Sequence, residues 1–267
     1  MSNMRIGVIG GGFMGEAFVG ALLREHIVEP GDVTVSDLAE TRREHLSSRY
    51  GVAVTTKNVQ AAEHAELLVL AVKPQEFPAV AVDLRGRLNK AQTVLTIMAG
   101  LTIERVAEEL AHDAVVRAMS NTAAFVGEAM TLWTASAAVP EERREAVAGL
   151  LRALGREAQV SDEKYLDMAT AVSGSGPGFV FLFLEALIDG AVHVGMRREL
   201  AQELAVQTLL GSAQLARELA QHPAALRNMV TSPGGTTAAG LQVLEDAGLR
   251  GAIIQAVEAA YERAKEL

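Results

Sequence analysis

Short apolar and β-branched runs alternate with longer segments of helical periodicity over the first 160 or so residues. Several runs are continuously apolar, as expected for strands that helices cover on both faces. This alternation is typical of a doubly wound α/β fold with a parallel sheet. We therefore predict strands within residues 5–10, 32–37, 52–55, 67–72, 93–98, 114–119, 129–135 and 156–160.

The pattern changes after residue 162, where long segments rich in Ala, Leu, Glu and Arg repeat with the 3.6-residue period of a helix. The segment from Pro177 to about Val194 predicts a helix roughly 27 Å long that is apolar around most of its circumference. One small domain seldom buries such a helix alone, so we expect a dimer with interleaved helical halves. The domains are predicted at residues 1–162 and 163–267.

Composition narrows the class of protein. Of 267 residues, 49% are hydrophobic and 21% charged, which is the balance of a soluble globular protein. The formal net charge of -9 and the scattered arginines argue against a nucleic-acid partner. The chain has no cysteine, which excludes disulfides and fits a reducing cytoplasmic compartment. Its 6 histidines are never spaced to share a helix face, so no metal is expected.

Two apolar segments bear on targeting. The first, "MRIGVIGGG", breaks into glycine too soon for a signal peptide. The run "GFVFLFLEALIDGA" is interrupted by Glu185 and Asp189 before it reaches the roughly 20 residues that span a bilayer. We therefore expect a soluble protein with no membrane partner.

The stretch "RIGVIGGGFMGEAFVGALL" carries the clearest chemical motif. Gly10, Gly12 and Gly15 follow a predicted strand and open a predicted helix. In a dinucleotide site the first glycine makes the turn, the second admits the pyrophosphate, and the third packs helix on strand. A structural glycine turn is the simpler alternative, and the flanking strand and helix favour the dinucleotide.

The end of the second predicted strand, "VTVSDLAETRR", leaves the coenzyme open. Asp37 lies near the position where an acid holds the ribose 2′-hydroxyl of NAD. Ser36 with Arg42 and Arg43 would instead suit the 2′-phosphate of NADP. Equally, the arginines could be the solvated first turn of the next helix.

Two further strand ends carry candidate residues. "LAVKPQ" places Lys73 and Pro74 at the carboxyl edge of the sheet, where ligands of open α/β sheets bind. "VRAMSNT" places Asn121 and Thr122 after another strand. A surface charge at Lys73 and plain capping by Asn121 or Thr122 are the alternatives.

Two glycine- and hydroxyl-rich stretches open helices in the second half, "AVSGSGPGF" at 171–179 and "VTSPGGTTAAG" at 230–240. The simple interpretation of the latter is a turn in which Pro233 ends one helix and Thr236 or Thr237 caps the next. Its excess of donors at a helix N-terminus suits a small anion such as a carboxylate. We expect both stretches to border one cleft.

The motifs together resemble those of pyrroline-5-carboxylate reductases. The similarity rests on "GVIGGGFMGEA", "LAVKPQ", "VRAMSNTAAFVGEAMT", "AVSGSGPGFVFLFLEALIDGAVHVGM", "QTLLGSAQL" and "HPAALRNMVTSPGGTTAAGLQVLE", in the family's order. It implies an α/β Rossmann-type sheet followed by an all-helical dimerisation domain. It further implies reduction of 1-pyrroline-5-carboxylate to proline with NADPH, or NADH, and dimers that form decamers in some members.

The resemblance also implies roles for single residues. The cofactor would be bound by Gly10, Gly12, Phe13, Met14, Gly15, Ser36, Asn58, Ala71, Lys73 and Pro74, and the substrate by Ser232, Gly235, Thr236 and Thr237. Thr237, the catalytic candidate, would hydrogen-bond the ring nitrogen. The family's "MPNTPALVGEG" reads "MSNTAAFVGEA" here, so Ser120 and Ala123 replace prolines and Phe125 is bulkier. These departures bear on the rigidity of the nicotinamide-side loop.

Two other functions remain open. A 3-hydroxyacid dehydrogenase of the 6-phosphogluconate dehydrogenase type shares the glycine start and a helical second domain, but it needs a lysine on the central helix. This chain has no lysine between Lys164 and Lys265. A non-catalytic dinucleotide-sensing dimer would also need a Rossmann half and a dimerisation half.

Overall fold

The computed structural model describes residues 4–266, which divide into two compact units. Unit 1 runs to Ser175 and includes the C-terminal segment from Ala259 onward. Unit 2 is Gly176–Glu258.

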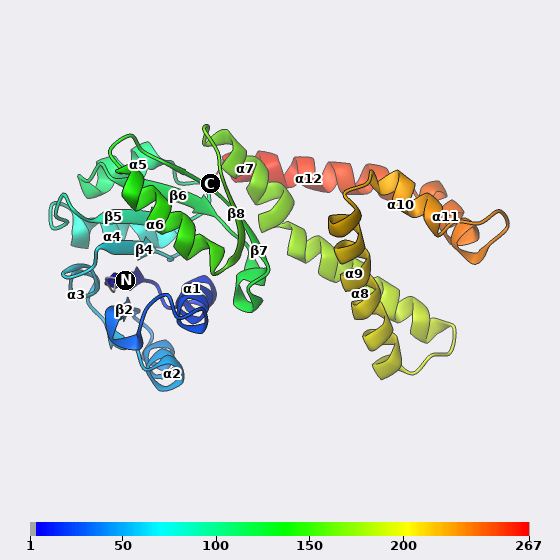
Figure 1. Ribbon diagram of the computed structural model, residues 1–267, viewed down its shortest axis with the longest axis horizontal. Helices are drawn as coiled ribbons and strands as arrows, with labels where there is room; N and C mark the ends of the chain where they lie inside the picture. The colour runs from blue at the N-terminus through cyan, green and yellow to red at the C-terminus, as the bar shows by residue number, and fades with distance from the viewer. Residues whose placement is uncertain (1–3, 267) are drawn as a thin grey trace. The chain divides into compact units, whose positions relative to one another are not determined.

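Unit 1 is built on an 8-stranded sheet of order β3-β2-β1-β4-β5-β6-β7-β8 (Figure 1). The strands are β1 Ile6–Ile9, β2 Val33–Ser36, β3 Ala53–Thr55, β4 Leu67–Leu70, β5 Thr93–Thr96, β6 Val115–Met119, β7 Ala129–Ala135 and β8 Gly155–Gln159. Every predicted strand is present and the fold class is confirmed. The sheet is parallel except at one pair, because β7 runs antiparallel to β6 with Met119 opposite Leu132.

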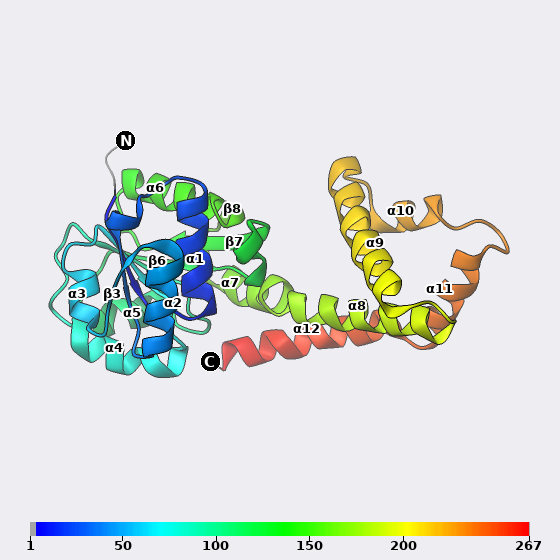
Figure 2. The same ribbon diagram turned by 90° about the horizontal axis from the view of Figure 1, so that it is seen from below.

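Helices cover both faces of this sheet (Figures 1 and 2), and buried side chains form a separate core on each face. Val8 packs with Phe18 on one face, whereas its neighbour Ile9 packs with Phe77 on the other. Each fully buried large apolar side chain contributes about 1.5–3 kcal/mol. The covering helices are α1 Phe13–Arg24, α2 Glu40–Tyr50 and α6 Glu141–Arg152 on the first face, and α3 Asn58–Ala62, α4 Phe77–Leu84 and α5 Ile103–Leu110 on the second.

The helical segment that follows β8 packs against β6 and β7. It comprises α7, Lys164–Ala169, and η4, a π-helical turn at Thr170–Gly174. The guanidinium of Arg117, on β6, is buried and donates to Glu163 at 2.9 Å and to Asp167 at 2.7 Å. This buried ion-paired arginine fixes α7 against the sheet.

Unit 2 is helical throughout, with α8 Gly176–His193, α9 Arg198–Leu219, α10 Pro223–Met229, α11 Thr236–Asp246 and the first part of α12, Leu249–Lys265. The helix predicted from Pro177 to about Val194 is confirmed as α8. Among the residues of unit 2, only Ala201 and Ala205 are buried. An apolar unit with so small a core needs further surface to cover it.

The continuous helix Lys164–His193 is long and apolar enough, by length and composition alone, to cross a membrane. The core helix of a soluble protein passes the same test, so this finding is weak evidence for a membrane span. The helix carries Glu185 and Asp189 in its apolar part. It presents large exposed side chains at Val180, Phe181 and Leu182.

Candidate active site

The glycine turn between β1 and α1 has the shape of a phosphate cradle. Gly10 has φ +100°, and a Cβ there would lie 2.7 Å from the carbonyl oxygen of Ala71. A side chain at Gly15 would collide with the Gly10 carbonyl, whereas Gly12 has no atom within 4 Å of the position of a Cβ. Gly12 is also the N-cap of α1, and no side chain caps that end. The first N–H groups of α1 therefore have no side-chain cap and lie beside the open space at Gly12, as an anion site requires.

The carboxyl ends of the neighbouring strands meet at this turn. The Gly10 N–H donates to the Ser36 carbonyl at 2.8 Å, and the Ala71 N–H donates to the Ile9 carbonyl at 2.8 Å. Lys73 is exposed just beyond β4, before the short 3₁₀ turn η2, Pro74–Glu76. Topology thus brings most of the predicted cofactor residues of unit 1 to one edge, the usual ligand edge of such sheets.

Ser36 and Asn58 contact each other directly. The Ser36 hydroxyl is buried and donates to Asn58 Oδ1 at 2.6 Å. The Asn58 amide donates in turn to Asp83 at 3.0 Å. Both residues were predicted separately to bind the cofactor. In the structure a hydrogen bond joins them at the end of β2.

Asp37 and the two arginines after it are all held by other groups. The Asp37 carboxylate accepts the N–H of Gly11 at 2.7 Å and of Ala39 at 2.8 Å. Arg43 donates to the carbonyls of Asp37 and Leu38, and Arg42 donates to the Gly11 carbonyl, each at 2.8 Å. The arginines are thus bonded to the loop rather than free in solvent. Asp37 fixes the glycine turn from the side of β2.

A buried carboxylate beside this turn was missed from the sequence. Glu16 is 5% exposed and pairs with Arg42, with His45 at 2.8 Å, and with the Tyr50 hydroxyl at 3.2 Å. Burial by itself raises the pKa of Glu16, but hydrogen bonds and charges from Arg42 and His45 lower that pKa below its usual value. The position of Glu16 next to the apolar Ala17 and Phe18 was the signal that could have indicated this buried carboxylate and its partners.

The loop after β6 is bonded at several points. Asn121 caps the 3₁₀ turn η3, Thr122–Val126, by accepting the Ala123 N–H at 3.1 Å, which confirms its capping interpretation. Its amide also donates to the Ser173 carbonyl in η4 at 3.1 Å. The Thr131 hydroxyl donates to the buried Ser120 hydroxyl at 2.9 Å. Hydrogen bonds therefore hold the loop in which Ser120 and Ala123 replace the family's prolines.

The π-helical turn η4 covers most of the "AVSGSG" motif. Gly174 lies against Met119 at the end of β6, where a Cβ would come within 2.6 Å of the methionine methyl. The Ser175 N–H closes the wide turn by donating to the Thr170 carbonyl at 2.8 Å. Such turns occur frequently at functional sites.

The "TSPGGTT" stretch of unit 2 departs from the simple turn that the sequence also allowed. Helix α10 ends at Met229, before Pro233, and the N-cap of α11 is Gly235, so neither Thr236 nor Thr237 caps it. Gly234 has φ +70°, and a Cβ at Gly235 would lie 2.5 Å from the Ser232 hydroxyl. Within residues 4–266, the hydroxyls of Ser232, Thr236 and Thr237 form no hydrogen bond. These hydroxyls serve no purpose in the turn itself.

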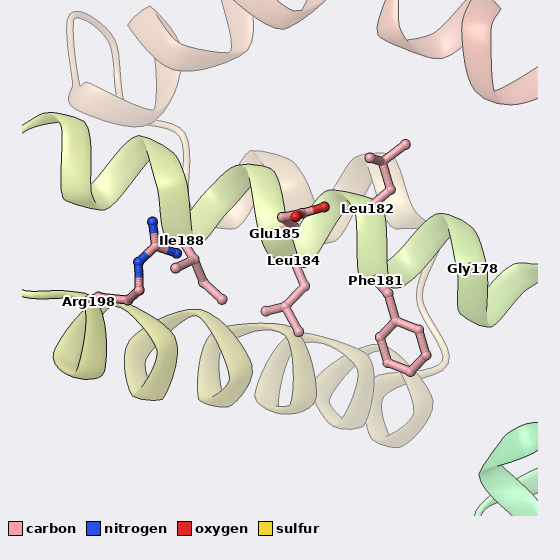
Figure 3. A pocket seen from close by; sticks show the side chains of 7 residues that line it. All are labelled: Gly178, Phe181, Leu182, Leu184, Glu185, Ile188 and Arg198. Carbon is pink, nitrogen blue, oxygen red and sulfur yellow. The ribbon is translucent and has the colours of Figure 1, made fainter.

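A groove of about 480 Å³ lies along α8 within unit 2. Figure 3 shows Phe181, Leu184 and Ile188 pointing from α8 toward α9, while Leu182 points the other way. Arg198, at the start of α9, borders the groove and pairs with Asp189 at 2.9 Å. The groove is mainly apolar and carries no arrangement of catalytic groups.

Comparison with known proteins assigns the family. The family model described as pyrroline-5-carboxylate reductase dimerisation matches residues 163–267, and one described as NADP oxidoreductase coenzyme F420-dependent matches residues 5–100. Pyrroline-5-carboxylate reductase of Synechocystis sp. is 43% identical over 99% of this chain and 98% of its own. The Escherichia coli reductase is 38% identical over 98% of both chains.

The chain belongs to the pyrroline-5-carboxylate reductase family.

Solved structures agree with this assignment. A Plasmodium falciparum pyrroline carboxylate reductase with NADP bound has a TM-score of 0.91 and 30% identity, covering 100% of this chain and 98% of its own. A Coxiella burnetii pyrroline-5-carboxylate reductase has a TM-score of 0.86 and 35% identity, covering 99% and 98%. The resemblance inferred from the motifs is confirmed, and the chain is an oxidoreductase of this family with a Rossmann-like sheet and a helical dimerisation domain.

Proposed function

We propose that the protein catalyses the NAD(P)H-dependent reduction of 1-pyrroline-5-carboxylate to L-proline, the last step of proline biosynthesis. The observation that carries the proposal is the open first turn of α1 at Gly12, which fits a dinucleotide pyrophosphate in a chain related over its whole length to reductases of this name. When bound, the reduced nicotinamide supplies a hydride to the carbon of the C=N bond. The protein's own contribution is to bind and orient.

For the cofactor, we assign the pyrophosphate to the N–H groups of Phe13 and Met14 above Gly12. The hydrogen-bonded pair Ser36 and Asn58 would border the ribose 2′-phosphate. Ala71, Lys73 and Pro74 would line the channel at the end of β4. We propose that the enzyme prefers NADPH. It would also accept NADH, because the Asp37 carboxylate lies at the same strand end.

For the substrate, we assign the carboxylate to the Ser232 hydroxyl and to the N–H groups of Thr236 and Thr237 in the first turn of α11. The Gly235 N–H donates to the Ser232 carbonyl at 3.0 Å, so Gly235 would border the carboxylate without donating to it. The unbonded Thr237 hydroxyl would hydrogen-bond the ring nitrogen and orient the imine. A protonated cyclic imine is already a strong hydride acceptor, so placement supplies most of the catalysis. No histidine, lysine or carboxylate is then required as a proton donor.

For the assembly, we propose residues 1–162 as the cofactor domain and residues 163–267 as the dimerisation and substrate domain of a cytoplasmic homodimer that can associate into decamers. The exposed apolar face of α8 supports this, because a second copy would cover it. The family model that matches residues 163–267 is itself described by dimerisation.

The decisive assay follows NADPH oxidation by absorbance with and without 1-pyrroline-5-carboxylate, with proline measured as product. We expect oxidation only when the imine is present. A matched variant, Gly12→Val, fills the open cradle and should abolish cofactor binding. Oxidation that does not depend on the imine would refute the reaction. Tight NADPH binding without turnover would instead favour a dinucleotide-sensing dimer.

A further inference from the structure

Two phenylalanines form a stacked pair beside the glycine turn. The rings of Phe13 and Phe125 lie with centroids 5.1 Å apart and planes inclined by 20°. Phe13 is the first residue of α1 and is 53% exposed, whereas Phe125 belongs to η3 and packs against the core. Phe125 is therefore the anchored ring, and Phe13 is the ring that it holds. We call the pair the aromatic clamp.

The glycine turn beside the clamp has few other restraints where it enters α1. Gly10, Gly11 and Gly12 are consecutive, so their backbone has more freedom than that of any other residue type. Gly11 is bonded to Asp37 and Arg42, but at Gly12 no atom lies within 4 Å of the position of a Cβ, and no side chain caps the start of α1. Phe13 is the first side chain after these glycines. Its stacking on Phe125 is therefore a restraint at the start of α1.

The other side of the clamp is well anchored. Besides the Asn121 cap of η3, Arg24 at the far end of α1 donates to the Phe125 carbonyl at 3.4 Å. The segment η3 thus contacts α1 at both ends, through Phe13 at the start and Arg24 at the finish. Phe125 is the bulky residue of the loop that lacks the family's two prolines. Ring stacking is the anchoring contact that this loop makes with the glycine turn.

We propose that the aromatic clamp holds the first turn of α1 in its cofactor-binding conformation, which makes Phe125 a positioning residue for the nicotinamide cofactor. This inference rests on the proposed function, because it requires the dinucleotide to bind at Gly12. Without the clamp the turn samples other conformations. The apparent Kd for the cofactor then rises in inverse proportion to the fraction of molecules in the binding-competent conformation. The strength of an aromatic pair sets the expected rise at about two- to tenfold.

The test measures the Kd of NADPH by fluorescence titration, without imine, in wild type, Phe125→Leu, Phe125→Tyr and the control Val126→Ala. Val126 adjoins Phe125 but is 71% exposed. We expect a two- to tenfold higher Kd in the leucine variant, a near-normal Kd when tyrosine restores the ring, and no change in the control. At saturating NADPH, kcat should stay within about twofold of wild type, because the clamp acts through cofactor affinity.

Phe13→Leu provides a second variant at a half-exposed position, where folding is not at risk. It should raise the Kd by the same factor, and the double variant Phe13→Leu/Phe125→Leu should be no worse than either single variant. Additive effects, or an unchanged Kd in both single variants, would overturn the clamp. Wild type that binds NADPH but does not reduce the imine overturns only the proposed reaction, whereas wild type that binds neither coenzyme overturns both.

Discussion

Replacing Thr237 by valine tests the substrate turn most directly. The Thr237 hydroxyl is half-buried and, within residues 4–266, has no hydrogen-bond partner. The N-cap of α11 is Gly235, so the substitution removes no capping bond. We therefore expect the free energy of unfolding to change by no more than about 0.5 kcal/mol, a shift in Tm of about 1–2 °C.

The effect on catalysis should be much larger than the effect on stability. A hydrogen bond to a charged group contributes about 1.5–3 kcal/mol, so losing the bond to the protonated imine should lower kcat/KM by about ten- to 150-fold. The KM for NADPH should change little, because the predicted cofactor residues belong to the other unit of the chain. Steady-state kinetics with varied 1-pyrroline-5-carboxylate measures the first quantity, and varied NADPH the second.

Thr231→Val is the matched control. Its hydroxyl donates to the Arg227 carbonyl at 2.7 Å, so this variant should lose about 1 kcal/mol of stability and keep its kcat/KM. Thr237→Val should thus lower kcat/KM with little loss of stability, whereas Thr231→Val should lower stability with little loss of kcat/KM. If Thr237→Val kept full turnover and lost only thermal stability, the assignment of the substrate turn would be refuted.

Three further predictions concern the coenzyme, the buried carboxylate and the assembly. Asp37→Ser should raise the ratio of kcat/KM for NADPH over NADH and lower both values, because the Gly11 N–H loses its acceptor; an unchanged ratio would contradict the role of Asp37. Glu16 has a lowered pKa, so its stabilisation is present above its usual pKa of 4.5 and is lost as the pH falls below that value. Glu16→Gln should therefore cost about 1–3 kcal/mol at pH 7 and flatten the acid side of the stability profile measured by urea unfolding. Wild type should sediment as a dimer or larger, and Leu182→Arg on α8 should weaken that association; a monodisperse wild-type monomer at micromolar concentration would refute the dimer.

Much of the fold could be predicted because its elements follow from local patterns. Continuous apolar runs such as Leu67–Leu70 are buried on both faces, so their type does not depend on distant residues. The same holds for α8, which is apolar over most of its length. The reversal of β7 could not be read in this way, because strand direction depends on how the loop between Met119 and Ala129 returns.

The candidate site was predicted only in part. Glycines that need a special conformation, such as Gly10, can be recognised by type and spacing, and the structure brings them to the expected edge. Long-range bonds have no such local signal. The pairing of Ser36 with Asn58 and of Phe13 with Phe125 depends on where separate loops meet in space. The simple alternative, a threonine cap of α11, was wrong because Gly235 holds the N-cap position, where glycine is about as favourable as threonine.

The antiparallel strand β7 determines the edge at which the chain leaves unit 1. Because β8 runs parallel to β7, it also runs opposite to β6, away from the ligand edge, and it ends at Gln159 beside Trp133, which pairs with Ala118. The following helix can therefore travel in the direction of β6, with Glu163 near Arg117 and Ser173 beside Asn121. Had β7 and β8 been parallel to the other strands, the same helix would start at the ligand edge and run away from it. Because β7 and β8 are reversed, the chain reaches the ligand edge at the point where its helical half begins.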